Sequence, residues 1–270
     1  MTEQSILAIM SQPDPGIRDL SNHLRMASRS FELRAHEVHV WTLDGSASKV
    51  AAARFDPLLS PDEKERAMRF RFDHLRHSFV VTRGVLRCLL ARYLNLHPAE
   101  IRFAYGEKGK PALASAADIE FNATHSHGSA LFAFAKGCRV GVDLEAVRPT
   151  AGAQDIADRF FCPEEAAEIR SLPPGERERA FFRCWTRKEA YIKAIGDGLS
   201  AALDGFRVTV QPGEPARLVH IAQDTVAAQA WTLDDLAPSA EFAAALAYRD
   251  RRRSLSTFAI DDAARLLDAP

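Results

Sequence analysis

Three carboxylates and one lysine are the residues of this chain whose types and spacing could do chemistry. Asp143 and Glu145 alternate with valine and leucine, so on a strand they share one face. Glu189 and Lys193 are four residues apart, so on a helix they project from the same side. Three oxygen donors without a nearby cysteine suit magnesium, which takes its remaining ligands from substrate phosphates. The same residues are also typical of a solvent-exposed sheet face and of an exposed salt bridge on a helix. A metal site and an ordinary polar surface therefore both stay open at this point.

The helix that must carry Glu189 and Lys193 is expected over residues 181–195. Its apolar stripe has the three- and four-residue spacing of a buried helix face: Phe181, Cys184, Trp185, Ile192 and Ile195. Lys188 stands where this stripe calls for a leucine, and buried charges of this kind are usually paired, metal-bound or functional. Gly196 and Gly198 supply the C-terminal stop.

The preceding part of the chain predicts a strand, a long helical region and further strands. Residues 37–43 alternate as a strand does, and Ser60-Pro61-Asp62-Glu63 is a strong helix start. The helical signal continues with interruptions to about Leu94 and is rich in arginine: Arg66, Arg69, Arg71, Arg76, Arg83 and Arg87. Strands are expected at residues 101–105, 121–128 and 130–135, with a turn over residues 106–111.

A comparison of the chain with itself indicates an internal duplication. At an offset of 102 residues, three separate landmarks of the first half fall on similar segments of the second: Val38 and Val40 on Val140 and Val142, Ser60-Pro61-Asp62-Glu63 on Cys162-Pro163-Glu164-Glu165, and Phe79 on Phe181. The candidate site residues have no counterparts, since Trp41 and Leu43 replace Asp143 and Glu145, and Arg87 and Ala91 replace Glu189 and Lys193. We therefore expect the chemistry in the second half.

Composition sets broad limits. The chain has 270 residues, 47% of them hydrophobic, and a net charge of −1, which gives no overall attraction to nucleic acid or membranes. We expect neither a transmembrane helix nor a signal peptide, hence a cytoplasmic protein. Four scattered cysteines, Cys88, Cys138, Cys162 and Cys184, are expected to be ordinary buried thiols.

Several motifs together resemble those of the 4′-phosphopantetheinyl transferases, of the long, surfactin-synthetase-activating type. They are Gly141-Val142-Asp143-Leu144-Glu145, the segment of residues 182–193 in the form F-x-x-W-T-x-K-E-A-Y-x-K, Gly109-Lys110-Pro111, and Phe121-Asn122-Ala123-Thr124-His125-Ser126. The resemblance implies an α/β fold with two halves related by a pseudo-twofold axis, a monomer with coenzyme A bound between them. We expect an extension at 1–35, a nucleotide-side half at 36–138, a magnesium-site half at 139–255 and a tail at 256–270.

The resemblance also implies roles for individual residues. Asp143, Glu145 and Glu189 match the magnesium ligands, and Lys193 matches the lysine that contacts the phosphates. Four residues match or neighbour the family's coenzyme A contacts in the motifs before residues 141–145: Lys110 near the nucleotide, Lys108 beside it, Thr124 where the family usually has serine, and His125 at the 3′-phosphate. Arg66 and Arg69 stand where relatives bring basic side chains to the 3′-phosphate, on a helix that is otherwise expected to be mostly solvated.

The implied reaction transfers the phosphopantetheine arm of coenzyme A to a serine of an apo acyl or peptidyl carrier protein and releases adenosine 3′,5′-bisphosphate. Glu189 is the expected base, with a metal-bound water as the alternative. The carrier, a small acidic helical domain in this family, is expected to dock on residues 148–179, which include Phe160 and Phe161. Two other classes stay open: a different magnesium-dependent phosphoryl or nucleotidyl transferase, and a nucleic-acid binder that uses the arginine-rich helix at 63–94.

Overall fold

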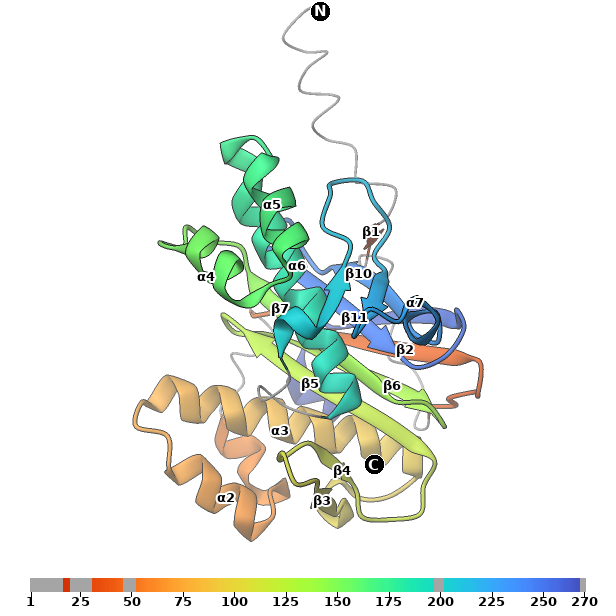
Figure 1. Cartoon of the computed structure of the whole chain (residues 1–270). Helices are drawn as coiled ribbons and strands as arrows, with labels where there is room; N and C mark the ends of the chain where they lie inside the picture. The colour runs from red at the N-terminus through yellow and green to blue at the C-terminus, as the bar shows by residue number, and fades with distance from the viewer. Residues whose placement is uncertain (1–16, 20–30, 46–51, 197–201, 268–270) are drawn as a thin grey trace, which may run out of the picture.

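Two four-stranded sheets form the centre of the computed structural model, which describes residues 17–19, 31–45, 52–196 and 202–267 (Figure 1). The first sheet has the order β12-β2-β6-β5, and the second has the order β1-β10-β11-β7. Their strands are β2 (Glu37–Leu43), β5 (Ile119–Ser126), β6 (Ser129–Lys136) and β12 (Ser254–Ile260) in the first sheet, and β1 (Ile17–Asp19), β7 (Val140–Ala146), β10 (Thr232–Ala237) and β11 (Phe242–Tyr248) in the second.

Each sheet carries one long helix on its outer face (Figure 1). The first half has α2 (Pro61–Met68), the long α3 (Asp73–Leu94) and a hairpin of β3 (Phe103–Tyr105) and β4 (Pro111–Leu113). The second half has α4 (Ala153–Phe160), α5 (Pro163–Ser171), the long α6 (Pro174–Ile195), a hairpin of β8 (Phe206–Val208) and β9 (Leu218–Ile221), and the short α7 (Thr225–Ala228). None of the described helices is long and apolar enough to cross a membrane.

The expected pair of α/β halves is confirmed by the order of the elements. The series β2-α2-α3-β3-β4-β5-β6 recurs as β7-α5-α6-β8-β9-β10-β11, with α4 and α7 inserted. The same local chemistry starts α2 and α5: Glu63 and Glu165 each complete a capping box and are buried. Each then pairs with the long helix of its half, Glu63 with Arg87 at 2.7 Å and Glu165 with Lys188 at 2.8 Å.

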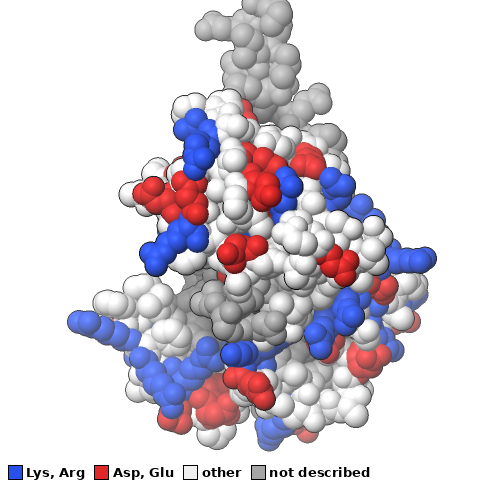
Figure 2. Space-filling model, viewed as in Figure 1, with Lys and Arg blue, Asp and Glu red and all other residues white. Residues whose placement is uncertain are grey.

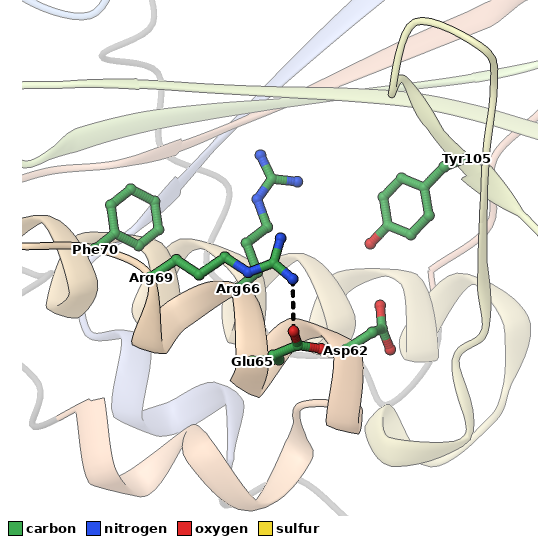
Figure 3. Close-up of a pocket in the computed structure, with 6 residues that line it drawn as sticks. All are labelled: Asp62, Glu65, Arg66, Arg69, Phe70 and Tyr105. Carbon is green, nitrogen blue, oxygen red and sulfur yellow. Dashed lines mark hydrogen bonds and ion pairs between the residues drawn. The ribbon is translucent and has the colours of Figure 1, made fainter.

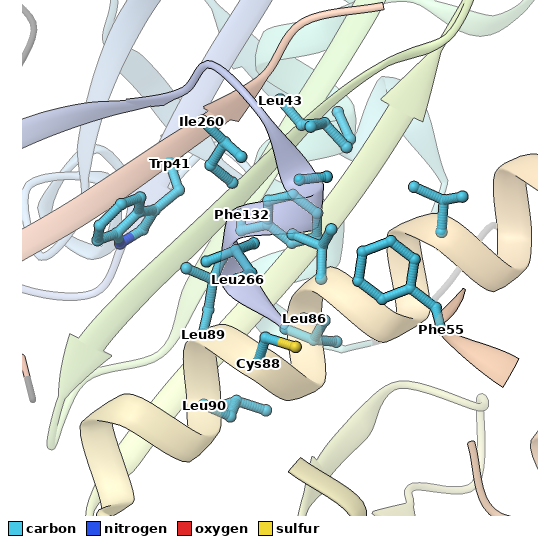
Figure 4. Packing of buried hydrophobic residues seen from close by; sticks show 14 of the residues in the cluster. Trp41, Leu43, Phe55, Leu86, Cys88, Leu89, Leu90, Phe132, Ile260 and Leu266 are labelled. Atoms are coloured by element: carbon cyan, nitrogen blue, oxygen red, sulfur yellow. The ribbon is translucent and has the colours of Figure 1, made fainter. Parts of the chain in front are cut away.

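The hydrophobic core has three parts, which follow from the two-layer plan. One lies between α3 and the first sheet and includes Trp41, Phe132 and Leu89 (Figure 4). A second lies between α6 and the second sheet. The third joins the inner faces of the two sheets, where Val38 and Val40 meet Val140 and Val142. The four cysteine thiols are buried and free, as expected.

Both chain ends differ from the simple division made from the sequence. The boundary at residue 255 cuts through β12, which pairs in parallel with β2 and so completes the sheet of the first half. At the other end, Ile17–Asp19 of the expected extension forms β1 beside β10, whereas Pro13, Pro15 and Gly16 lie outside the described residues. Gly196 ends α6 with a φ of 86°, as predicted, and Gly198 also lies outside the described residues.

Candidate active site

Helix α6 lies directly on the face of β7 that carries Asp143 and Glu145. Gly141 on this face allows the approach, because a Cβ atom there would lie 2.1 Å from the carbonyl oxygen of Ala190. The contact buries Asp143, which is only 3% exposed. The interpretation of this face as the wet side of a sheet is therefore wrong.

Asp143, Lys193 and Thr124 form a small polar cluster from three elements, β7, α6 and β5. Lys193 Nζ lies 2.5 Å from Asp143 Oδ1 and donates to Thr124 Oγ1 at 3.2 Å. The Thr124 hydroxyl donates to the same Asp143 oxygen at 3.3 Å. The cluster joins the two halves, since Thr124 belongs to the first half and the other two belong to the second.

Glu189 lies one helical turn before Lys193 and is also buried. Burial raises the pKa of its carboxyl group, and the negative charges of Asp143 and Glu145 raise it further, while Lys193 lowers it. The pKa of Glu145 is likewise raised, first by burial and then by Asp143. The three carboxyl groups therefore lie close enough to repel one another, and a cation among them would relieve this repulsion.

The donor set partly fits a divalent metal. Asp143 Oδ2 and Glu189 Oε1 are buried and accept no hydrogen bond within the described part of the chain, so both oxygens could bind a cation. However, no three acidic, histidine or cysteine side chains of the described residues are arranged as a metal site. Lys193 holds Oδ1 of Asp143, whereas Oδ2 stays available to a cation. The metal assignment stays a prediction.

Strand β5 runs beside β7 and is joined to it by three polar side chains. Asn122 Oδ1 accepts from the backbone N–H of Val142 at 2.9 Å, Thr124 reaches Asp143, and the Ser126 hydroxyl donates to Glu145 Oε2 at 3.2 Å. All three alternate along one face of β5. The N-x-T-H-S motif thus supplies the seam between the halves.

The residues expected at the nucleotide end of coenzyme A are divided between two places. His125 is exposed at the end of β5, on the face opposite to Thr124, and Lys108 is exposed in the turn before β4. Lys110 donates instead to the carbonyl oxygens of Val140 at 3.2 Å and Ala194 at 3.0 Å. Burial lowers the pKa of this ammonium group to about 8. Lys110 therefore ties the first half to β7 and α6.

Arg66 and Arg69 line a surface pocket of about 610 Å³ between α2 and β3 (Figure 3). Arg69 is paired with Glu65 at 2.6 Å, and the guanidinium group of Arg66 lies over the ring of Phe79. Tyr105 faces both arginines across the pocket (Figure 3). On the molecular surface, lysine and arginine side chains gather over α2 and the neighbouring part of α3 (Figure 2).

Two other arginines of the region are unavailable to a nucleic acid. Arg83 and Arg87 are buried, with Arg87 paired to Glu63 at 2.7 Å and Arg83 at 3.4 Å from the same carboxylate. A nucleic-acid binder would therefore have to use a smaller basic surface than the sequence indicated.

The segment expected to dock a carrier has one exposed aromatic residue and one buried one. Phe160, at the end of α4, is 43% exposed, and the guanidinium group of Arg159 lies over its ring. Phe161 is only 3% exposed and packs against Phe181 and Trp185 in the core. Of the two aromatic residues in this segment, only Phe160 is therefore on the surface, and the docking site stays a prediction.

Sequence reasoning missed several polar contacts that hold the site together. Lys188, fully buried, pairs with Glu165 and donates to the carbonyl oxygens of Leu203 and Phe206, so its role is structural. Its neighbour Arg187 pairs with Asp235 of β10 at 2.5 Å. The charges in the apolar stripe of α6 were a signal for such pairs, but their partners are distant in the sequence.

Comparison with known proteins identifies the family. Residues 139–247 match the model of the 4′-phosphopantetheinyl transferase superfamily, and residues 47–137 match that of the 4′-phosphopantetheinyl transferase N-terminal region. The chain is 38% identical over 221 residues to the 4′-phosphopantetheinyl transferase HetI of Nostoc sp., a match covering 81% of this chain and 90% of HetI. It is 31% identical over 166 residues to the 4′-phosphopantetheinyl transferase Sfp of Bacillus subtilis, covering 62% of this chain and 73% of Sfp. The chain therefore belongs to the 4′-phosphopantetheinyl transferase superfamily, as an enzyme of the long, Sfp-like type.

Proposed function

We propose that this enzyme transfers the 4′-phosphopantetheine arm of coenzyme A to a serine hydroxyl of an apo carrier protein, with Mg²⁺ held by Asp143, Glu145 and Glu189. The main support is the junction of β5, β7 and α6, where two buried carboxylate oxygens that have no hydrogen-bond partner among the described residues lie beside a lysine. Mg²⁺ bound there would neutralise charge on the pyrophosphate.

In this proposal the side chains of the chain position the reactants and move one proton. The serine oxygen forms a bond to the phosphorus that bears the pantetheine arm, and the bond from this phosphorus to the bridging oxygen breaks. Adenosine 3′,5′-bisphosphate leaves with the bridging oxygen. Glu189 takes the serine proton, a role supported by its place on α6 beside Lys193 and by its carboxylate oxygen Oε1, which accepts no hydrogen bond among the described residues. Lys193, beside Asp143, offers its ammonium group to the phosphate oxygens.

The nucleotide end would lie on the first half. His125 is exposed at the end of β5 and would contact the 3′-phosphate, with Lys108, Arg66 and Arg69 as further cations on the same half. Lys110, already held by two carbonyl oxygens, would fix the loop beside the nucleotide. Thr124 would keep its position between the halves.

The carrier would dock on α4, where Phe160 and Arg159 offer an apolar and a cationic contact beside each other. An acidic helical domain fits such a surface, because its charge matches Arg159 and its apolar residues can cover the ring. We further propose that the enzyme acts as a monomer in the cytoplasm.

The test is transfer from coenzyme A to a panel of apo carrier proteins, read by intact mass. The expected result is a gain of one phosphopantetheine group that depends on Mg²⁺ and is lost when the acceptor serine is replaced by alanine. The second product, adenosine 3′,5′-bisphosphate, is measured by chromatography in equal amount. Transfer at an unchanged rate in excess chelator would contradict the metal assignment.

A further inference from the structure

A chain of hydrogen bonds runs from the protein surface to Glu145, through residues to which the mechanism gives no role. Arg148 Nη1 lies 3.2 Å from His127 Nε2, and His127 Nδ1 lies 3.1 Å from Ser126 Oγ. Ser126 Oγ in turn donates to Glu145 Oε2 at 3.2 Å. The backbone N–H of Ala146 also donates to Ser126 Oγ, at 3.3 Å.

The donor and acceptor capacities of these groups allow one self-consistent arrangement. An ionised Glu145 can only accept hydrogen bonds, so the Ser126 hydroxyl must donate its single hydrogen to it. The serine oxygen can then only accept, from Ala146 N–H and from His127, which must therefore carry its proton on Nδ1. Arg148 can only donate hydrogen bonds, so His127 Nε2 must be unprotonated and accept a hydrogen bond from it. All three side-chain bonds thus point towards Glu145.

We propose that His127, as the neutral Nδ1–H tautomer, is a positioning residue that orients Glu145 for the metal through Ser126. The hydrogen bond from Ser126 engages Oε2 and would leave the other carboxylate oxygen of Glu145 for the cation. This inference rests on the metal site of the proposed function.

The backbone at His127 helps to design the test. His127 has a φ of 49°, a left-handed conformation that asparagine and glycine adopt more readily than most residues. Asparagine also places an amide N–H near the position of Nδ1, so His127→Asn keeps the donor to Ser126. Glutamine reaches the position of Nε2 instead, so His127→Gln keeps only the contact with Arg148. His127→Gly removes the strain of the left-handed backbone but provides no side-chain hydrogen bond. His127→Ala keeps that strain and also provides no side-chain hydrogen bond.

The first measurement is Mn²⁺ affinity in the presence of saturating coenzyme A, followed by electron paramagnetic resonance on the full chain. Loss of a residue that supports a metal ligand typically costs 10- to 100-fold in affinity, so the Ala, Gly and Gln variants should each weaken binding by about 10-fold or more. His127→Asn should stay close to the native protein. If His127→Gly binds as well as the native protein, or His127→Asn is as weak as His127→Ala, the proposal is wrong.

The second measurement needs neither metal nor activity. Long-range ¹H–¹⁵N spectra of the imidazole should show Nδ1 protonated and Nε2 bare, the opposite of the tautomer that free histidine favours. A protonated Nε2 in neutral His127 would overturn the proposal. If the native protein does not bind Mn²⁺ with coenzyme A at all, the proposed metal site is wrong, and so is the role of His127 in orienting a metal ligand. The spectrum of the imidazole then still decides whether the chain of hydrogen bonds from Arg148 to Glu145 exists.

Discussion

At the scale of single residues, Asp143 is the side chain whose surroundings constrain the chemistry most. One of its oxygens is held by Lys193 and Thr124, and the other is buried without a hydrogen bond within the described residues. An oxygen in this state costs free energy unless a ligand satisfies it. A cation bound at this oxygen would satisfy it.

We expect Asp143→Asn to lose transfer at ordinary Mg²⁺ concentrations while the protein stays folded. The amide keeps the shape of the carboxylate and an acceptor for Lys193 but is a much poorer ligand for Mg²⁺. The hydrogen bond from Lys193 then has a neutral acceptor in place of a charged one, which should cost about 1 kcal/mol of unfolding free energy, measured by urea denaturation. Asp73→Asn, at an exposed ion pair in the first turn of α3, is the control and should retain activity. Full activity of Asp143→Asn would remove Asp143 from the metal site.

Glu189 differs from Asp143 because the proposed function gives it two duties, metal ligation and proton transfer. Glu189→Gln should lower turnover by about 10²-fold or more, the usual contribution of a general base. Coenzyme A binding, measured by calorimetry, should weaken much less, since Asp143, Glu145 and Lys193 remain. If binding and single-turnover transfer fall by the same factor, Glu189 is a metal ligand only and a metal-bound water becomes the candidate base.

At the scale of elements, the site depends on how closely α6 lies on β7. This distance is set by Gly141, where the missing side chain leaves room for the backbone of α6 at Ala190 and Ala194. The approach brings Glu189 and Lys193 to the two acidic residues of the strand. The site is therefore built by packing of two regular elements rather than by a flexible loop.

Gly141→Ala should push α6 away from β7. The added Cβ would lie 2.1 Å from Ala190 O and 2.4 Å from Ala194 N, both backbone atoms that cannot turn aside. Overpacking of this kind typically costs about 1–3 kcal/mol of unfolding free energy, and we expect activity to fall further because the acidic cluster is displaced. Gly175→Ala is the matched control, since nothing lies within 4 Å of its Cβ position in the first turn of α6. Equal stability of the two variants would contradict this account.

The sequence was sufficient for elements with strong local signals. The capping box at Ser60, the alternation in β7 and the glycine stop of α6 depend on neighbouring residues, and all three are present. The pairing of β12 with β2 was missed because it joins segments that are about 200 residues apart and leaves no local pattern. The burial of Asp143 was missed for a similar reason, although Gly141 was a sign that another backbone comes close.

The sequence predicted the residue types of the site but not their contacts, again because the contacts join segments that are distant in the sequence. A motif identifies residue types, so the acidic residues and Lys193 were found together. It does not identify partners across the seam between the halves, so the contacts of Ser126 with Glu145 and of Lys110 with two carbonyl oxygens were missed. Hydrogen bonds of this kind depend on how the halves pack, which local sequence does not encode.

At the scale of the whole molecule, the two halves share an order of elements but bring different side chains to the seam between them. The second half supplies the acidic cluster on β7 and α6, and in the first half the equivalent strand carries Trp41 and Leu43, which belong to the core. Lys110 and β5 of the first half reach across the seam and hold the second. Coenzyme A bound between the halves would meet a different surface at each end.

The different surroundings of Lys110 and His125 predict that stability and nucleotide recognition separate between them. Lys110→Ala removes the donor that two carbonyl oxygens share, so unfolding free energy should fall by about 1–3 kcal/mol, as measured by denaturation. The preference for coenzyme A over dephospho-coenzyme A should survive in this variant. His125→Ala should show the reverse. Its stability should be near native because the ring is exposed, and its preference for coenzyme A should be lost.

A charge-assisted contact worth about 1.5–3 kcal/mol corresponds to a native preference of about 10-fold or more, which calorimetry resolves readily. If Lys110→Ala abolishes the preference instead, its ammonium group binds the 3′-phosphate directly, and the tie between the halves is a secondary role.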